Sequence, residues 1–306
     1  MTPNEQSAAP RPLPTAARRY LIVTADDFGL HESVNRAVEE ASHAGILTAA
    51  SLMISGPAAA DAIARAKQLP LLRVGLHLVL ADGWSTLSHT EIPSLTNRDG
   101  FMDGNMLRRG IAISVSRSTR RQVEAEMRAQ FEAYRRSGLP FDHVNVHKHF
   151  HLHPTVLGLL LSLAREYGVP AIRIPHEPFW FCRNHGTWRS CLSAAMLAPL
   201  IELMKYRIRA AGIFRNDCVF GIARSGAMDE AMLLSVLSGL PPGVTEIYLH
   251  PASQDRGGIT GSMAGYRHAD ELAGLLSVRV RSAVAALNVT RGGYSDVLRS
   301  AGRALA

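Results

Sequence analysis

The chain has 306 residues, of which 47% are hydrophobic and 19% charged, so we expect a sizeable buried core and exclude a disordered or collagen-like protein. Its formal net charge is +7, but the arginines are scattered and no nucleic-acid-binding motif is present, so we expect no nucleic acid partner. Three cysteines without a Cys-x-x-Cys spacing argue against a disulfide framework or a thiolate zinc site.

The N-terminal segment carries no signal for export or membrane insertion. Residues 1–18 are rich in Pro and Ala, and we expect them to form a flexible leader. No stretch approaches the roughly 18 to 20 uninterrupted apolar residues that cross a bilayer. We therefore expect a cytoplasmic protein whose folded domain covers residues 19–306.

From residue 20 onward, short apolar runs alternate with helical patterns. Tyr20–Thr24 predicts a buried strand that ends in a polar turn, and apolar residues at helical spacing from Val34 predict a helix that ends at Gly45. Six more strand-like runs follow, at Ala50–Ile54, Arg73–Leu80, His143–His149, Ala171–Pro175, Cys218–Ile222 and Val244–His250. Such alternation predicts βα units around a mainly parallel sheet.

Seven strands with no linker-like segment between them favour one closed or nearly closed barrel over two domains. An open, doubly wound sheet is the alternative, although the Gly-x-Gly-x-x-Gly motif of dinucleotide-binding folds is absent after the first strand. Residues 82–116 show no clear periodicity, and we expect them to form a loop over the strand ends.

Polar residues gather where the predicted strands end. Asp26 and Asp27 follow the first strand, His77 lies in the third, and five histidines lie between residues 143 and 153. Because side chains alternate along a strand, residues 143, 145, 147, 149 and 151 are expected on one face. Each feature alone has an ordinary explanation, such as a turn, a helix cap or a core histidine. Buried together, they favour one divalent metal ion, zinc or magnesium.

Two later strand ends carry further polar residues. His250 precedes Pro251 at the end of the last predicted strand, where it suits a general acid or is simply a turn histidine. Arg173 and Glu177 lie at the end of the fifth strand. An arginine there can orient a carboxylate, and the alternative is an ordinary surface ion pair.

Five motifs occur in order along nearly the whole chain: Thr24-Ala-Asp-Asp-Phe-Gly29, Gly75-Leu-His-Leu78, Asn145-x-His-x-His-x-His151, Arg173-Ile-Pro175 and Glu246-Ile-Tyr-Leu-His-Pro251. Together they resemble the YdjC-like carbohydrate deacetylases. The hopanoid-biosynthesis-associated branch, the HpnK-type proteins, looks closest, on the strength of Thr48–Met53, Gly56–Ala60, Val74–Leu80 and His147–Pro154.

The resemblance implies a fold, a cofactor and a reaction. The fold is α/β, a distorted TIM-like (β/α) barrel of the polysaccharide-deacetylase kind in a single domain. One divalent metal ion is implied, and often a homodimer. The implied reaction removes the N-acetyl group from an N-acetylated amino sugar, which in the hopanoid branch is attached to a hopanoid lipid.

Family roles carry over to the matching positions. Asp27, His77 and His147 match metal ligands, and Asp26 matches the catalytic base. The base would take a proton from metal-activated water, and His250 would protonate the leaving amine.

Five residues are expected to bind substrate or to support the metal ligands: Asn145, His149, His151, Arg173 and Glu177. Many relatives have Asp where this chain has Asn145, so the amide is expected to orient a ligand without adding charge. His149 and His151 match family histidines without an individual role.

Other functions stay open beside hopanoid-linked sugar deacetylation. One is deacetylation of soluble chitooligosaccharides, and another is non-catalytic sugar or lipid binding with a structural metal. Glycoside hydrolysis by the two acids is disfavoured, because neighbouring strand residues point to opposite faces and the histidines would have no task.

A helix-length apolar segment covers residues 190–209 and ends in three cations, Lys205, Arg207 and Arg209. It suits a helix that contacts the surface of an anionic membrane, which would place the protein at the inner face of the membrane. The alternative, which we favour, is a helix packed on the barrel or at a dimer contact.

Overall fold

The structure is a computed structural model that describes residues 18–253, 259 and 263–300, so residues 1–17 of the expected leader lie outside the described residues. Its strands are β1 (Arg19–Phe28), β2 (Ala49–Leu52), β3 (Arg73–Leu78), β4 (Gly83–Trp84), β5 (Phe101–Met102), β6 (Val144–Val146), β7 (Cys218–Phe220), β8 (Gly243–Leu249) and β9 (Thr290–Arg291). Its helices are α1 (Glu32–Ala44), α2 (Ala59–Gln68), α3 (Met106–Val115), α4 (Arg117–Ser137), the 3₁₀ helix η1 (His147–Leu152), α5 (Pro154–Glu166), α6 (Phe179–His185), α7 (Trp188–Ala210), α8 (Glu230–Ser238), α9 (His268–Leu276), α10 (Val278–Ala286) and α11 (Tyr294–Ser300).

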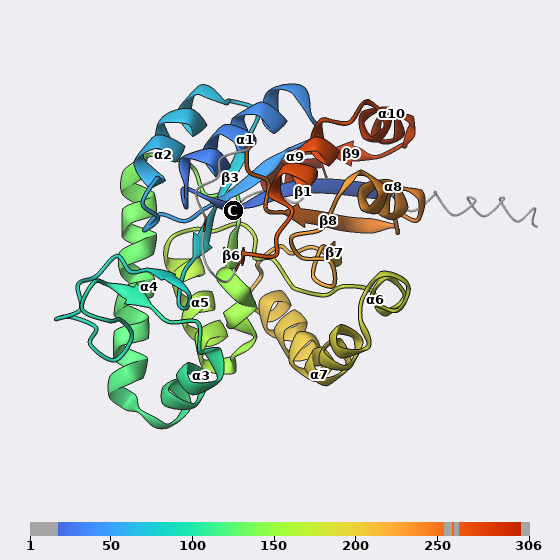
Figure 1. Cartoon of the computed structure of the whole chain (residues 1–306). Coiled ribbons are helices and arrows are strands. Elements are labelled where there is room, and N and C mark those ends of the chain that lie inside the picture. Colours follow the sequence, from blue (N-terminus) through green and yellow to red (C-terminus); the bar gives the residue numbers. More distant parts are fainter. Residues whose placement is uncertain (1–17, 254–258, 260–262, 301–306) are drawn as a thin grey trace, which may run out of the picture.

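Parallel strands form the centre of the fold. Their order in the sheet is β6-β3-β2-β1-β8-β7, and β9 also pairs with β1. Figure 1 shows the strands gathered at the centre with helices around them. Because the strands are parallel, their carboxyl ends meet at one end of the sheet, where ligands bind in folds of this type.

Residues 171–176 span the gap between β6 and β7. The carbonyl oxygen of Ala171 accepts a hydrogen bond from the Val144 N–H, and that of His176 accepts one from the Val219 N–H, both at 2.9 Å. The strand expected at Ala171–Pro175 is therefore present only as isolated bridges. The result is the expected distorted, TIM-like α/β barrel.

Side chains along the strands alternate between the surrounding helices and the barrel interior. The outward residues of β1 belong to a large apolar cluster with the helices: Leu21, Val23 and Ala25. The first inward residues, Tyr20 and Ile22, pack in a smaller cluster with Tyr294 of α11. This cluster fills one end of the interior, so the polar inward residues that follow along β1 lie toward the other end.

Two expected segments differ from the structure. Residues 82–116 are not one loop, because they contain the hairpin β4–β5 and helix α3, which the Asn105 side chain caps by accepting from the Arg108 N–H at 3.0 Å. Strand β6 ends at Val146, and Lys148 and His149 have φ angles of 54° and 55°. This left-handed backbone breaks the alternation, so residues 149 and 151 do not continue the face that carries 143, 145 and 147.

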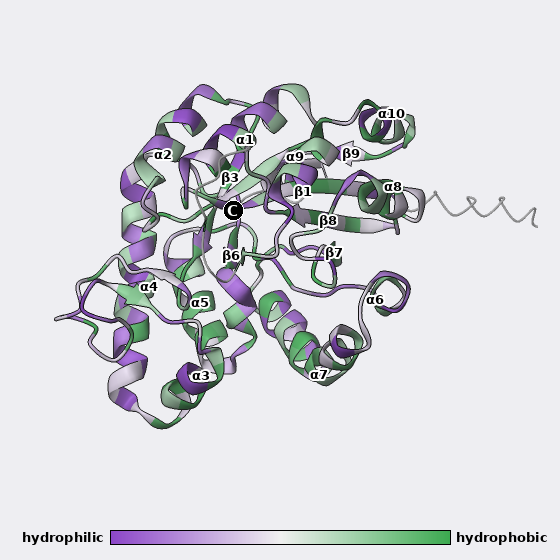
Figure 2. Ribbon diagram, viewed as in Figure 1, coloured by the Kyte–Doolittle hydropathy of each residue, from purple (hydrophilic) through white to green (hydrophobic). Residues whose placement is uncertain are grey.

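Helix α7 contains the expected apolar segment but is only partly packed on the barrel. Ile201, Met204 and Ile208 are buried, whereas Leu192 is 51% exposed and Met196 is 65% exposed. Figure 2 shows hydrophobic colour over much of this helix. The expected packing on the barrel is therefore present in the second half of the helix, whereas its first half is exposed in the single chain and the expected dimer contact stays a prediction. Among the described residues, no helix has both the length and the apolarity to cross a membrane.

Candidate metal centre and active site

The two adjacent acids lie at a bulge in β1. The pairing of β1 with β2 shifts register between Ala25 and Phe28, and Asp27 has a φ angle of 63°. Asp is one of the few residue types that adopt this left-handed backbone at modest cost. Consequently Asp26 and Asp27 both reach the same site: Asp26 contacts Asn145, and Asp27 contacts His77. The expectation that neighbouring strand residues face opposite ways is wrong at this pair.

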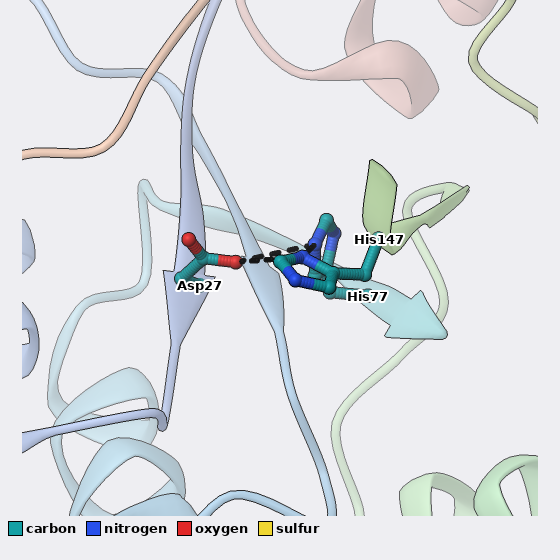
Figure 3. Close-up of side chains that lie close together, drawn as sticks. All are labelled: Asp27, His77 and His147. Carbon is teal, nitrogen blue, oxygen red and sulfur yellow. Dashed lines mark hydrogen bonds and ion pairs between the residues drawn. The ribbon is translucent and has the colours of Figure 1, made fainter. Parts of the chain in front are cut away.

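Asp27, His77 and His147 form a compact triad (Figure 3). Asp27 Oδ1 lies 3.3 Å from His77 Nε2 and 3.4 Å from His147 Nδ1, and the two nitrogens are 3.2 Å apart. All three residues are buried. The side chains come from the carboxyl ends of three parallel strands of one sheet, β1, β3 and β6, and each strand end delivers one ligand atom.

The triad fits a divalent cation. Ligand atoms about 2.0 to 2.2 Å from a tetrahedral zinc ion stand roughly 3.3 to 3.5 Å apart, close to the separations in the triad. Both carboxylate oxygens of Asp27 are buried without a hydrogen-bond partner among the described residues, which is costly unless a cation binds there. Two imidazoles and one carboxylate also leave coordination positions for water and substrate.

Asn145 links the triad to the second acid. Its Oδ1 lies 2.7 Å from His77 Nδ1, so the amide accepts the Nδ1 proton and leaves the Nε2 lone pair free for a metal. Its Nδ2 donates to Asp26 Oδ1 at 3.0 Å and to Ser51 Oγ at 2.9 Å. The amide is thus placed to orient the His77 ring, and its Nδ2 adds donors that a carboxylate would lack.

Asp26 is held by a buried arginine. Arg173 Nη1 and Nη2 donate to its two oxygens at 2.5 and 2.9 Å, and the same guanidinium binds Glu246 at 2.7 and 2.8 Å. Ser51 donates to Asp26 at 3.0 Å. Arg173 is fully buried, so the alternative of a surface ion pair with Glu177 is excluded. Burial would raise the pKa of Asp26, but the charge of Arg173 outweighs it and holds that pKa well below its usual range.

Neither acid is suited to donate a proton at neutral pH. Burial would raise the pKa of Asp27, but the close His147 and His77 rings outweigh it and hold that pKa well below its usual range. Glycosidases need one carboxylic acid with a raised pKa to protonate the leaving oxygen. The electrostatics of the pair therefore disfavour glycoside hydrolysis, although the bulge removes the objection from strand alternation.

His250 lines a small pocket with a volume of about 200 Å³, together with Asp26, His77 and His147. Its Nε2 is 3.9 Å from Asp27 Oδ2. Its backbone is fixed by Glu271, which accepts from the His250 N–H at 2.6 Å. Burial lowers the pKa of His250, and the charges of Asp27 and Asp26 oppose that shift.

The other expected residues lie around this pocket in different roles. His149 lines it, with Nε2 3.5 Å from the Tyr248 hydroxyl. His151 is buried behind it, 3.0 Å from the carbonyl oxygen of Arg173, and burial lowers its pKa to about 4. Glu177 does not contact the Asp27, His77 and His147 triad. Its carboxylate instead accepts hydrogen bonds from the backbone N–H groups of residues 221–223 at 2.8 to 3.0 Å.

Sequence reasoning missed four residues that contact the site. Ser51 and Glu246 bind the Asp26–Arg173 pair, and the Tyr248 ring lies 4.9 Å from the guanidinium carbon of Arg173. Lys148 lines the pocket and pairs with Asp82 at 2.6 Å. Strand alternation does carry a signal for two of them: Glu246 and Tyr248 share the inward face of β8 with His250.

Comparisons with known proteins agree with this geometry. A family model described as "YdjC-like protein" matches residues 20–286. A carbohydrate deacetylase of Brevibacillus brevis is 41% identical over 155 residues, which cover 51% of this chain and 59% of the relative. A chitooligosaccharide deacetylase of Serratia marcescens is 33% identical over 160 residues, which cover 52% of this chain and 60% of the relative. The chain thus spans about three fifths of the length of these curated relatives.

A solved structure shares the fold. The crystal structure of an Enterococcus faecalis protein described as a cellobiose-phosphate cleavage protein superposes with a TM-score of 0.71 at 23% identity. The match covers 92% of this chain and 99% of the other. At this identity, the likeness establishes the arrangement of strands and helices alone.

Proposed function

The chain belongs to the YdjC-like family, and from this premise we propose that it is a metal-dependent hydrolase that removes the N-acetyl group from an amino sugar. The observation that carries the proposal is the Asp27, His77 and His147 triad, which lies at a small pocket lined by Asp26, His77, His147 and His250. The names of the deacetylase relatives support the same reaction. The metal is zinc or magnesium, since nitrogen ligands favour zinc while the carboxylate and open positions admit magnesium.

The triad, Asp26 and His250 each have a task in amide hydrolysis. A divalent cation, when bound, supplies a Lewis acid for the amide carbonyl and lowers the pKa of water. Asp26 accepts the proton of the attacking water, and Arg173 and Asn145 hold its carboxylate in place. His250 gives a proton to the leaving amine nitrogen. Its lowered pKa makes the imidazolium a stronger acid while reducing the protonated fraction at neutral pH.

We propose that the sugar is N-acetylglucosamine linked to a hopanoid. The resemblance of Thr48–Met53 and His147–Pro154 to the hopanoid-associated branch supports this substrate. A specific observation favours the alternative, a soluble chitooligosaccharide, because the relative from Serratia marcescens carries that name. Non-catalytic sugar or lipid binding is the third hypothesis, and it assigns no function to Asp26 and His250.

A lipid-linked substrate requires that the protein reach a membrane. The exposed first half of α7 supports peripheral contact with an anionic membrane at its inner face, and Trp188 is 71% exposed at the start of that helix. The same surface also suits a homodimer contact, which the family resemblance implies.

The test is a direct assay of free amine. The protein, loaded with zinc or with magnesium, is incubated with N-acetylglucosaminyl hopanoid and with N,N′,N″-triacetylchitotriose, and released amine and acetate are measured. Amine release that stops after metal removal and returns with metal supports the function, and the faster substrate identifies the class. Binding of either substrate with no acetate released would leave only the non-catalytic reading.

A further inference from the structure

We infer that an apolar groove beside the metal pocket binds the hydrocarbon part of the sugar's aglycone; the inference rests on the proposed function and names the part of the substrate that this surface recognises. The groove has a volume of about 410 Å³, within the range of small-molecule sites. It lies between the helices α6 and α7, the 3₁₀ helix η1, residues 175–177 and the segment that follows β7. Its apolar wall includes Leu152, Pro175, Phe179, Leu197, Ile201 and Ile222.

The groove adjoins the metal pocket. His149 and Ile222 line both cavities, so the two share part of a wall. The amide of a bound amino sugar must lie at the triad, since that is where the ligand atoms and Asp26 converge. A substituent on the sugar that leaves the metal pocket on the side of His149 therefore enters the groove directly.

The chemistry of the groove favours hydrocarbon over more sugar units. The carboxylates on its wall are already paired: Glu177 binds the backbone of residues 221–223, and Glu202 binds Lys205 at 2.7 Å. His176 Nδ1 lies 2.9 Å from the carbonyl oxygen of Asp217. Sugar hydroxyls need free donors and acceptors, which these engaged groups do not supply, whereas apolar surface gains by leaving water.

The outer end of the groove opens onto exposed apolar surface. Phe179 is 57% exposed and Leu197 is 37% exposed, so both form its rim. From Ser190 to Ile201, α7 contains no charged residue. Exposed apolar surface next to a cavity marks a place where an apolar group enters or leaves. The groove thus connects the metal pocket with the surface from which a lipid-linked sugar would come.

Binding without chemistry provides the first test. Octyl β-glucoside and methyl β-glucoside lack an acetyl group and differ only in the hydrocarbon, and their affinity for the full chain can be measured by calorimetry below the micelle concentration. Each buried methylene contributes about threefold to fourfold in affinity. We expect the octyl compound to bind at least tenfold more tightly, with a negative heat-capacity change.

A matched pair of variants locates the site. Ala198 lines the groove and is exposed, so Ala198→Trp fills the groove without disturbing the core, whereas Met196→Trp adds a similar ring on the same helix away from the groove wall. We expect Ala198→Trp to abolish the octyl preference and Met196→Trp to keep it. Equal octyl preference in both variants, or none in the unmodified protein, overturns the inference.

Kinetics separate this inference from the proposed function. The matched substrates are methyl and octyl N-acetylglucosaminide, assayed as released amine with the metal-loaded protein. A higher kcat/KM for the octyl substrate that falls in Ala198→Trp supports both proposals. Deacetylation at equal rates for both substrates rejects the groove and keeps the function. An octyl preference in binding without any deacetylation keeps the groove and rejects the function.

Discussion

At the scale of single residues, the site depends on backbone conformations that ordinary strand geometry does not provide. Asp27, Lys148 and His149 all have positive φ angles, and all lie in or beside the metal pocket. Such conformations cost about 1 to 3 kcal/mol each and persist where the surrounding structure enforces them. At Asp27 this cost turns a second carboxylate toward the histidines. The strained residues thus mark the functional end of the barrel.

Removing one ligand should remove the metal. His77→Ala deletes one of three ligands, and the remaining two cannot hold a cation tightly, so we expect metal content and deacetylase activity to fall together. Metal per protein after dialysis, measured by mass spectrometry, tests this. His149→Ala, which removes a nearby imidazole outside the triad, should keep the metal. Full occupancy in His77→Ala would contradict the assignment.

Asn145 should affect the metal through His77. Asn145→Ala removes the acceptor that fixes the His77 ring, so we expect a loss of metal affinity on the order of 10- to 100-fold. Titration with zinc against a competing chelator measures it. Ser51→Ala is the control, because Ser51 contacts Asn145 and Asp26 but no member of the triad. An equal loss of affinity in both variants would show that the effect is not transmitted by the ring.

Proton transfer should separate from metal binding. Asp26→Asn keeps the shape of the side chain, and Arg173 retains Glu246 as a partner, so the fold and the metal should persist. We expect turnover to fall by roughly 10² to 10⁴ in Asp26→Asn and in His250→Ala, the contribution of general acid or base catalysis. Turnover and metal content are measured on the same samples. Unchanged turnover in both variants would mean that other groups move the protons.

The alternation of side chains along the strands predicts much of the site. It does not predict the residues whose positions depend on a local change of backbone conformation or on a segment without regular strand pairing. Asp26, His77 and Asn145 converge because they occupy inward positions near the carboxyl ends of parallel strands in one curled sheet, which alternation predicts. The positions of His149 and His151 could not be predicted, because a His-x-His-x-His run is compatible with a strand. No residue in the run indicates that the backbone at Lys148 is left-handed. Alternation along β8 also predicts that Glu246 faces the site. The position of its partner Arg173 could not be predicted in this way, because the segment that carries Arg173 forms only isolated bridges.

At the scale of elements, Arg173 joins parts of the barrel that backbone pairing holds weakly. The segment 171–176 makes only isolated bridges, yet its arginine binds Asp26 on β1 and Glu246 on β8 across the interior. Tyr294 of α11 donates to Glu246 at 2.5 Å, and Thr24 donates at 2.6 Å. A buried network of ion pairs therefore links this segment to β1 and β8, where a regular strand would be held by backbone hydrogen bonds.

Breaking this network should destabilise the fold strongly. Arg173→Met leaves two buried carboxylates without their cation, and we expect a loss of about 3 to 5 kcal/mol in the free energy of unfolding. Arg73→Met is the matched control, because Arg73 makes a bidentate pair with Asp296 at a partly exposed position, where a loss below about 1 kcal/mol is expected. Denaturant unfolding of both variants provides the comparison. A similar loss of unfolding free energy in the two variants would show that the buried network stabilises the fold no more than a partly exposed ion pair does.

At the scale of the whole molecule, the first half of α7 presents apolar side chains to solvent. Leu192 and Met196 lie on this surface, and Trp188 and Arg189 are exposed at its start. The cations expected to touch lipid are partly engaged elsewhere, since Lys205 pairs with Glu202 and Arg207 donates to the carbonyl oxygen of Pro154 at 2.9 Å. The hydropathy of the sequence predicts the helix. It does not predict which half of the helix is exposed, because burial depends on which residues of the helix pack against other elements.

Sedimentation with vesicles should reveal whether this surface meets lipid. We expect binding to phosphatidylserine-containing vesicles that weakens with salt, because exposed Arg183 and Arg189 flank the apolar face and each cation near an anionic surface contributes about 1 kcal/mol. The double variant Leu192→Ser, Met196→Ser should lose binding. The matched control is Leu107→Ser, Ile111→Ser on α3, which changes an exposed apolar pair on another helix. A protein that stays in the supernatant at every salt concentration, and whose dimer dissociates in the α7 variant, would show instead that a second copy covers this face.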